Sequence, residues 1–137
     1  MEIEREKTSN LNVFECEIEV KPEDIDELGH VNNVVYLRWV QQVASAHWQS
    51  KALRAISDKY LWVVLRHEID YFKPALLKDK IKAQTWVSSM EGVKSIRNVK
   101  FMSNGSDLAL AKTVWCLLDA ISMKPKRIGD DIKNIFS

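Results

Sequence analysis

Apolar and polar residues alternate along much of the chain with the two-residue period of a β-strand. Residues 13–20, VFECEIEV, are the first example, and Pro22 ends that stretch. A later stretch, YLWVVLRHEIDYF, is rich in β-branched and aromatic residues, and Pro74 follows it. Asn104-Gly105 is a strong signal for a two-residue hairpin turn. The pattern predicts strands at residues 13–20, 60–72, 79–90, 93–103 and 107–121.

One segment, from about Asn33 to Gln49, has a helical period instead. Apolar side chains recur every three or four residues along it, and polar side chains occupy the opposite side. This pattern predicts an amphipathic helix of about 17 residues. The positions on the apolar side are Tyr36, Val40, Val43 and His47, and those opposite are Arg38, Gln41, Gln42, Ser45 and Gln49.

The order of these elements predicts an α+β domain that covers residues 1–137. One strand and one helix precede four strands joined by short connections, and short connections favour antiparallel neighbours. One helix covers only one face of a sheet, yet the last strand is apolar on both faces and the chain has 5 tryptophans. We therefore expect a second face or an edge to be buried against another copy of the chain. The alternative is that some strands bend around the helix.

Composition excludes several functional classes. Lys and Arg number 20 against 19 Asp and Glu, so the overall charge gives no reason to expect nucleic-acid binding. The beginning of the chain is charged and lacks the apolar segment of a signal peptide, and no run is long enough to span a bilayer. A cytoplasmic protein with no membrane partner is the expectation. Cys16 and Cys116 are expected to be reduced core residues, without the spacing of a metal site.

The histidines and the helix aromatics have ordinary explanations. His47 lies on the apolar side of the helix and is expected to be packed and hydrogen-bonded, whereas His67 lies in a strand with no visible partner. Three scattered histidines do not predict a metal site. Tyr36 and Trp39 are more often core residues than a wall of a substrate site.

The segment before the helix, DIDELGHVNNVVYLRWV from Asp24 to Val40, raises a different question. Acids and asparagines before a helix are common caps, but they can also perform chemistry. The stretch EDIDELGHVNNVVYLRW resembles the signature of hotdog-fold thioesterases of the 4-hydroxybenzoyl-CoA thioesterase type and the matching segment of acyl-ACP thioesterases. IDYFKPALLKDKI is similar to a later stretch of the same family, and the resemblance extends from about Val13 to Ile128.

This resemblance implies a hotdog fold, in which a five-stranded antiparallel sheet wraps one long central helix. It also implies that two subunits pair to form a continuous sheet, so a homodimer or homotetramer is expected. The implied activity is hydrolysis of an acyl-CoA or acyl-ACP thioester without a metal or an organic cofactor. Such a reaction needs a group that attacks the carbonyl carbon or activates water, and a donor for the oxyanion that forms.

The resemblance assigns these roles to Asp26 and Asn33. Asp26 matches the catalytic carboxylate of the family, as nucleophile or as general base, and the backbone amide of Asn33 matches the group that polarises the carbonyl. A helix N-terminus suits the second role because its first N–H groups are unpaired. No acid lies between Asn33 and Gln49, so a catalytic acid on the helix is absent. Asp24 is then expected to be a turn or capping residue, and a purely turn-forming Asp26 is the alternative.

Further residues are placed by the same resemblance. The side chain of Asn33, where some relatives carry histidine or tyrosine, is expected either to cap the helix or to orient Asp26 or a water. His30 resembles a histidine of the acyl-ACP thioesterases, with a solvent-exposed turn residue as the alternative. Lys94, Ser95 and Arg97 align with a stretch that meets CoA, and residues 124–127, KPKR, are a second candidate for its phosphates. Solvated strand ends are the alternative for both groups.

Two rival functions remain. A hotdog domain can hold an acyl chain or a partner without hydrolysing it, although the presence of Asp26 argues against such a binding module. A hotdog dehydratase needs a paired catalytic acid and histidine in an Asp-x-Asn-Pro-x-His pattern, which this chain lacks.

Overall fold

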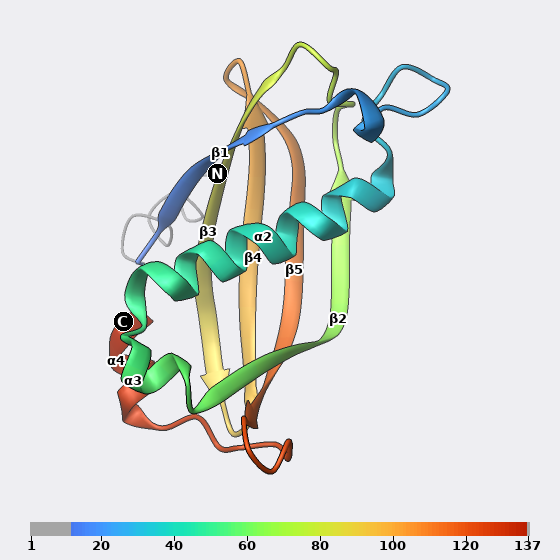
Figure 1. The fold of residues 1–137 in the computed structure, drawn as a ribbon. Helices are drawn as coiled ribbons and strands as arrows, with labels where there is room; N and C mark the ends of the chain where they lie inside the picture. Colours follow the sequence, from blue (N-terminus) through green and yellow to red (C-terminus); the bar gives the residue numbers. More distant parts are fainter. Residues whose placement is uncertain (1–11, 137) are drawn as a thin grey trace.

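The computed structural model describes residues 12–136, which form one antiparallel five-stranded sheet curved around a long helix (Figure 1). The predicted α+β class is confirmed, and the long helix begins at the predicted residue and extends two residues further. The elements are β1 (Phe14–Glu19), η1 (Pro22–Asp24), α2 (Asn33–Lys51), α3 (Arg54–Ser57), β2 (Tyr60–Tyr71), β3 (Lys80–Glu91), β4 (Lys94–Ser103), β5 (Ser106–Asp119) and α4 (Asp130–Phe136).

The strand order is β1-β3-β4-β5-β2, which makes β1 and β2 the two edges of the sheet. The expectation that β2 and β3 are neighbours is therefore wrong. The connection between them, residues 72–79, is longer than a usual hairpin loop, and it carries the chain from one side of the sheet to the other. The β4–β5 hairpin is as predicted, because Asn104 and Gly105 both have positive φ, at 51° and 75°.

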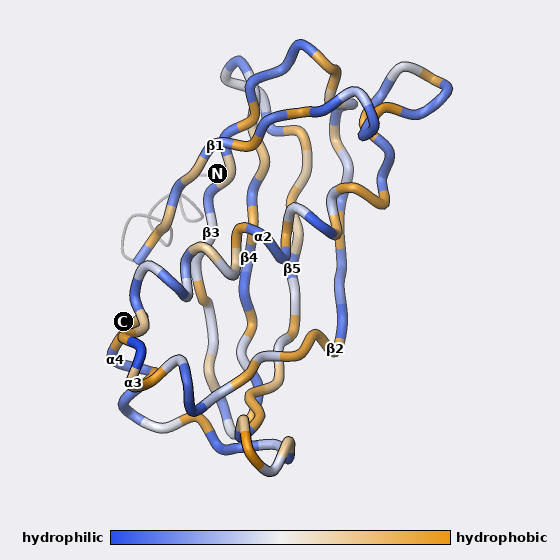
Figure 2. The backbone as a smooth tube through the Cα atoms, viewed as in Figure 1, coloured by the Kyte–Doolittle hydropathy of each residue, from blue (hydrophilic) through white to orange (hydrophobic). Residues whose placement is uncertain are grey.

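The core lies between α2 and the concave face of the sheet. Alternating residues of β4 are buried there, and Figure 2 shows hydrophobic and hydrophilic residues mixed along the strands. Around the first half of α2 the packing is aromatic, with the ring of Tyr36 5.0 Å from that of Trp39 and 5.3 Å from that of Phe101. Both helix aromatics are thus core residues, as expected. A second apolar cluster, which includes Leu117, lies between the sheet and α4.

Two expectations from composition can be checked. Cys16 and Cys116 are free cysteines, as predicted. No helix within residues 12–136 is long and apolar enough to cross a membrane.

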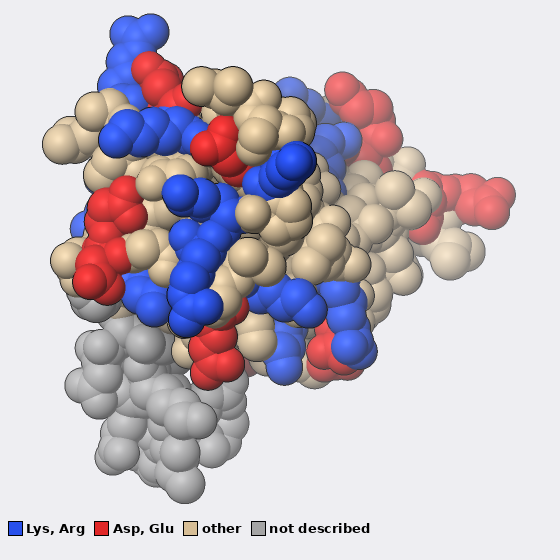
Figure 3. Space-filling view, turned by 90° about the horizontal axis from the view of Figure 1, so that it is seen from below, with Lys and Arg blue, Asp and Glu red and all other residues tan. Residues whose placement is uncertain are grey.

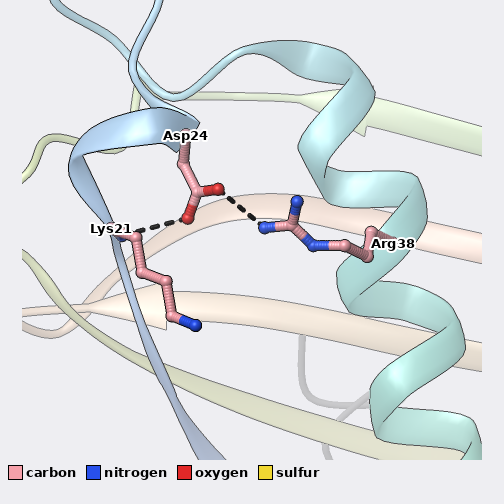
Figure 4. Close-up of polar contacts among 3 residues, drawn as sticks. All are labelled: Lys21, Asp24 and Arg38. Atoms are coloured by element: carbon pink, nitrogen blue, oxygen red, sulfur yellow. Dashed lines mark hydrogen bonds and ion pairs between the residues drawn. The ribbon is translucent and has the colours of Figure 1, made fainter.

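A buried carboxylate fixes the position at which α2 begins. Asp24 is only 1% exposed, and its Oδ1 lies 2.7 Å from Nη2 of Arg38 on α2 (Figure 4). Its Oδ2 accepts a hydrogen bond from the backbone N–H of Lys21 at 3.0 Å, and its carbonyl oxygen accepts one from the N–H of Asn32 at 2.9 Å. Asp24 therefore has the capping role expected of it, and it joins the end of β1 to the helix.

Burial works against ionisation of Asp24, but the hydrogen bonds from Arg38 and Lys21 outweigh it and hold the pKa of this carboxyl below its ordinary value. An acid with a lowered pKa in the folded state stabilises the fold above the pKa of the unfolded state. That contribution is lost as the pH falls through the folded-state pKa.

We expect Asp24→Asn to lower the free energy of unfolding by about 2 kcal/mol at pH 7, because Arg38 loses its counter-ion and the amide has one acceptor oxygen where the carboxylate uses two. Urea unfolding at several pH values measures this loss. The difference between the two proteins should be constant above about pH 5 and shrink as the pH approaches 2.

Asp58→Asn is the matched control, because Asp58 pairs with Arg54 at 3.8 Å with both side chains mostly exposed. Its effect should stay below about 0.5 kcal/mol. An equal loss in the two variants, or a loss in Asp24→Asn that is the same at pH 7 and pH 2, would contradict this account.

Candidate active site

Residues 26–30 form a compact turn that projects from the end of the molecule at which α2 begins (Figure 1). The turn is closed by a bond from the N–H of Asp26 to the carbonyl of His30, at 2.8 Å, and by another from the N–H of Gly29 to the carbonyl of Asp26, at 3.0 Å. Gly29 has a φ of 80°, a conformation that side chains rarely adopt. Ile25 and Val31 pair as an isolated bridge at the base of the turn.

The two oxygens of the Asp26 carboxylate have different surroundings. Oδ1 accepts hydrogen bonds from the backbone N–H groups of Leu28, at 2.9 Å, and His30, at 3.3 Å. Within residues 12–136, Oδ2 has no hydrogen-bond partner. Asp26 therefore stabilises the turn through Oδ1, and Oδ2 remains available for chemistry.

The cap of α2 is Asn32 and not Asn33. The side-chain oxygen of Asn32 accepts a bond from the N–H of Val34 at 3.0 Å, and the carbonyl of Asn32 accepts one from Val35 at 2.9 Å. One of the two expectations for the Asn33 side chain, that it caps the helix, is thereby wrong. The backbone N–H of Asn33 has no partner among the described residues. An unpaired N–H at the positive end of a helix dipole is suited to hold an oxyanion.

A cavity of about 390 Å³ lies between the turn, the helix start and the end of β2. All three residues predicted to be catalytic, Asp26, His30 and Asn33, line this one cavity. The structure thus brings together the carboxylate, the histidine and the unpaired amide.

Three residues of the wall were missed by the sequence reasoning, and they come from the end of β2 and the loop after it. These are Tyr71, Phe72 and Lys73. The Tyr71 hydroxyl donates a hydrogen bond to the carbonyl of Asn33 at 3.2 Å, and its ring lies 5.4 Å from that of Tyr36. Burial raises the pKa of Tyr36 to about 12, so its hydroxyl stays protonated at physiological pH. The aromatic pair directly before Lys73-Pro74 was the available signal.

Lys94, Ser95 and Arg97, predicted to meet CoA, do not line this cavity. Lys94 is exposed, whereas Ser95 and Arg97 are buried on the concave face of β4, where Arg97 is only 6% exposed. Ser95 and Arg97 line a second cavity beside Trp48, about 22 Å along α2 from Asn33. Within one chain, Ser95 and Arg97 are therefore far from the cavity that Asp26, His30 and Asn33 line.

The second phosphate candidate, residues 124–127, lies in an exposed loop after β5. Figure 3 looks onto this end of the molecule and shows Lys and Arg side chains interspersed with Asp and Glu. Among the side chains drawn in colour, neither positive nor negative charge dominates this end of the molecule.

The remaining histidines have defined partners. Nδ1 of His47 lies 2.8 Å from Nη1 of Arg97, so the expectation of a packed, hydrogen-bonded histidine is confirmed. His67 does have a partner, contrary to expectation, because its Nδ1 lies 2.9 Å from Oγ1 of Thr113 on β5. Among residues 12–136, no three His, Cys, Asp or Glu side chains gather in a way that would hold a metal ion.

Comparisons with known proteins place this geometry in a family. The family described as acyl-ACP thioesterase N-terminal domain matches residues 11–136. The acyl-CoA thioester hydrolase YbgC of Escherichia coli O6:H1 is 25% identical over 129 residues, which cover 90% of this chain and 95% of that protein.

Solved structures agree in fold. A thioesterase from Thermus thermophilus, crystallised with coenzyme A and zinc, has a TM-score of 0.79 and 24% identity, over 88% of this chain and 89% of that one. The 1,4-dihydroxy-2-naphthoyl-CoA thioesterase Slr0204 from Synechocystis has a TM-score of 0.76 and 18% identity, over 90% and 95% of the two chains. Since the family match spans nearly the whole chain, this protein belongs to the acyl-ACP thioesterase family and has the hotdog fold of such thioesterases.

Proposed function

We propose that this protein hydrolyses acyl-CoA thioesters, with Asp26 as the group that performs the chemistry. One observation carries the proposal: a carboxylate oxygen and a helix-start N–H, both without partners among the described residues, line the same cavity. The activity named for the Escherichia coli relative, acyl-CoA thioester hydrolysis, supports it. An acyl-ACP presents the same phosphopantetheine thioester, and it is the alternative substrate.

In the proposed reaction, the carbonyl oxygen of the thioester accepts a hydrogen bond from the N–H of Asn33. The dipole of α2 adds a partial positive charge at this point, so negative charge that develops on the oxygen is stabilised. The hydrogen bond from Tyr71 to the carbonyl of Asn33 holds the end of β2 against the helix start. The oxyanion donor is therefore pre-organised by contacts on both sides of the cavity.

Two routes use Asp26. In one, Oδ2 attacks the carbonyl carbon, the C–S bond breaks to release the thiolate, and water then hydrolyses the mixed anhydride. In the other, Asp26 takes a proton from a water that attacks the same carbon. The bonds from Leu28 and His30 to Oδ1 fix the carboxylate in either route and leave Oδ2 as the reacting oxygen.

We further propose that two copies of the chain pair through β2. This strand is a 12-residue edge with three exposed aliphatic side chains, Leu61 at 43%, Val63 at 37% and Leu65 at 53%. An edge of this kind is a template for pairing with another strand. Antiparallel pairing of β2 with its copy would bury these side chains and continue the sheet across both subunits.

Asp26→Asn should lower the rate of acyl-CoA hydrolysis by at least about 100-fold. The melting temperature should change little, because the amide oxygen of asparagine can still accept bonds from Leu28 and His30. The measurement is release of free thiol from a panel of short, long and aromatic acyl-CoAs.

Glu27→Gln is the control, because it removes an exposed carboxylate from the adjacent position of the same turn. It should retain full turnover. If Asp26→Asn kept the rate of the unaltered protein on its best substrate, the assignment of Asp26 would be wrong.

Val63→Lys should shift the protein from dimer to monomer, because it places charges at an apolar pairing edge. Light scattering coupled to size-exclusion chromatography measures the mass. Leu53→Lys, at another exposed leucine outside the sheet, should leave the mass unchanged. A monomeric unaltered protein, or a Val63→Lys variant with the unaltered protein's mass, would disprove pairing through β2.

A further inference from the structure

The second cavity, at the far end of α2, has a volume of about 340 Å³, and five of its lining residues are aromatic. It lies between the second half of α2, the first part of β2, the central strands β4 and β5, and α4. A volume of this size suits a small organic ligand. The aromatic side chains around it are Trp48, Tyr60, Trp62, Trp115 and Phe136.

A buried cation, Arg97, lies among these aromatic side chains. Arg97 is on the concave face of β4, and no carboxylate among residues 12–136 forms an ion pair with it. Its guanidinium carbon lies 5.6 Å from the ring centre of Phe136. Arginines buried to this extent are nearly always paired, since an isolated charge is costly to remove from water.

The two hydrogen-bond partners of Arg97 are neutral and use only one of its nitrogens. Nη1 donates to Nδ1 of His47 at 2.8 Å and to Oγ1 of Thr85 at 3.0 Å. Thr85 in turn donates to the carbonyl of Asn98 at 2.8 Å, so its hydroxyl is free to accept from Arg97. A guanidinium has five N–H donors. The N–H groups on Nε and Nη2 of Arg97 have no acceptor among residues 12–136.

The ring of His47 is neutral, so His47 is not a charged partner of Arg97. Burial, Arg97 and Lys51 together lower the pKa of His47 to about 4, so its ring is neutral and accepts through Nδ1. Burial also lowers the pKa of Arg97, to about 10, which leaves the guanidinium charged at neutral pH. Among residues 12–136, the hydrogen-bond partners of Arg97 are therefore neutral, and its positive charge has no ion-pair partner.

A second donor in the same cavity also lacks a partner. Nε1 of Trp115 is buried and has no hydrogen-bond partner among the described residues. Trp115 pairs directly with Ser95 in the β4–β5 ladder, and Arg97 lies two residues along β4 on the same face. Ser95 also lines the cavity, so the side chains of Trp115, Ser95 and Arg97 lie beside one another there on adjacent strands.

We propose that this cavity binds a carboxylate carried on an apolar or aromatic body. Arg97 and the indole N–H of Trp115 hold the carboxylate, and the surrounding tryptophans hold the body. A carboxylate supplies the counter-charge that Arg97 lacks, and its two oxygens fit the remaining face of the guanidinium fork.

Two sources of this carboxylate fit the chemistry. One is a free organic acid. The other, which rests on the proposed thioesterase function and pairing through β2, is the far end of an acyl group. Antiparallel pairing places the start of β2, with Tyr60 and Trp62, beside the end of the partner's β2. This cavity in one subunit would then adjoin the Asp26 cavity of the other.

Titration calorimetry with 3-phenylpropionate and the neutral 3-phenylpropionamide tests the proposal. The unaltered protein should bind the acid at least about tenfold more tightly than the amide. Arg97→Met should abolish this preference, and Arg97→Lys should retain part of it. Arg54→Met, which removes an exposed arginine from α3 outside both the cavity lining and β2, should leave the preference intact.

Trp115→Phe provides an independent variant in case substitutions of Arg97 impair folding. It removes the N–H and keeps an aromatic wall, so it should weaken binding of the acid several-fold and leave binding of the amide unchanged. Absence of binding, equal affinity for acid and amide, or a preference that survives in both Arg97→Met and Trp115→Phe would overturn the proposal.

Hydrolysis of adipoyl-CoA and hexanoyl-CoA, which have acyl chains of equal length, distinguishes the two sources. A higher kcat/KM for adipoyl-CoA that disappears in Arg97→Met identifies the acyl group as the ligand. Equal values in a protein that binds the free acid identify a free acid. Failure to hydrolyse either thioester would count against the proposed function, while calorimetry would still decide the carboxylate site.

Discussion

The buried carboxylate of Asp24 is the constraint on which the candidate site depends. The carboxylate accepts from the Lys21 amide after β1 and from the Arg38 side chain on α2, and the backbone carbonyl of Asp24 accepts from the Asn32 amide before the helix. Together they fix the point at which the chain leaves the sheet and the point at which the helix starts. The turn that carries Asp26 lies between these two points, so its position relative to the Asn33 amide follows from the same contacts.

The concave face of the sheet has a different character at each end of α2. Around the first half of the helix the packing is apolar, with Tyr36, Trp39 and Phe101 in contact. Around the second half, His47 and Arg97 are buried among aromatic rings. The first end offers a helix dipole and a free amide, and the second offers a guanidinium. In the proposed dimer, a ligand with a developing oxyanion at one end and a carboxylate at the other would match both.

Much of the fold was predictable because it is local in sequence. The change from a two-residue to a helical period gave the start of α2, and Asn104-Gly105 gave a hairpin, because positive φ at both positions suits these residues. The place of β2 was not predictable in this way. Strand pairing between distant segments depends on the packing of the whole sheet, and the connection at residues 72–79 is compatible with more than one partner.

The site was predictable in part. Asp26, His30 and Asn33 came from a motif, but the motif does not reveal that one oxygen of Asp26 serves the turn. Asn32 and Asn33 have the same capping propensity, so only the structure shows which of them caps the helix. Arg97 was expected to meet CoA, with a solvated strand end as the alternative. It shares its phase along β4 with Val99 and Phe101, and that phase indicates burial.

The most direct test of the central claim is a crystal structure with an acyl-CoA analogue in which a methylene separates the sulfur from a ketone. The account predicts that the ketone oxygen lies about 3 Å from the backbone nitrogen of Asn33. It also predicts that Oδ2 of Asp26 faces the ketone carbon, directly or through one water. A ketone bound away from the start of α2, or an Asp26 carboxylate directed away from it, would contradict the account.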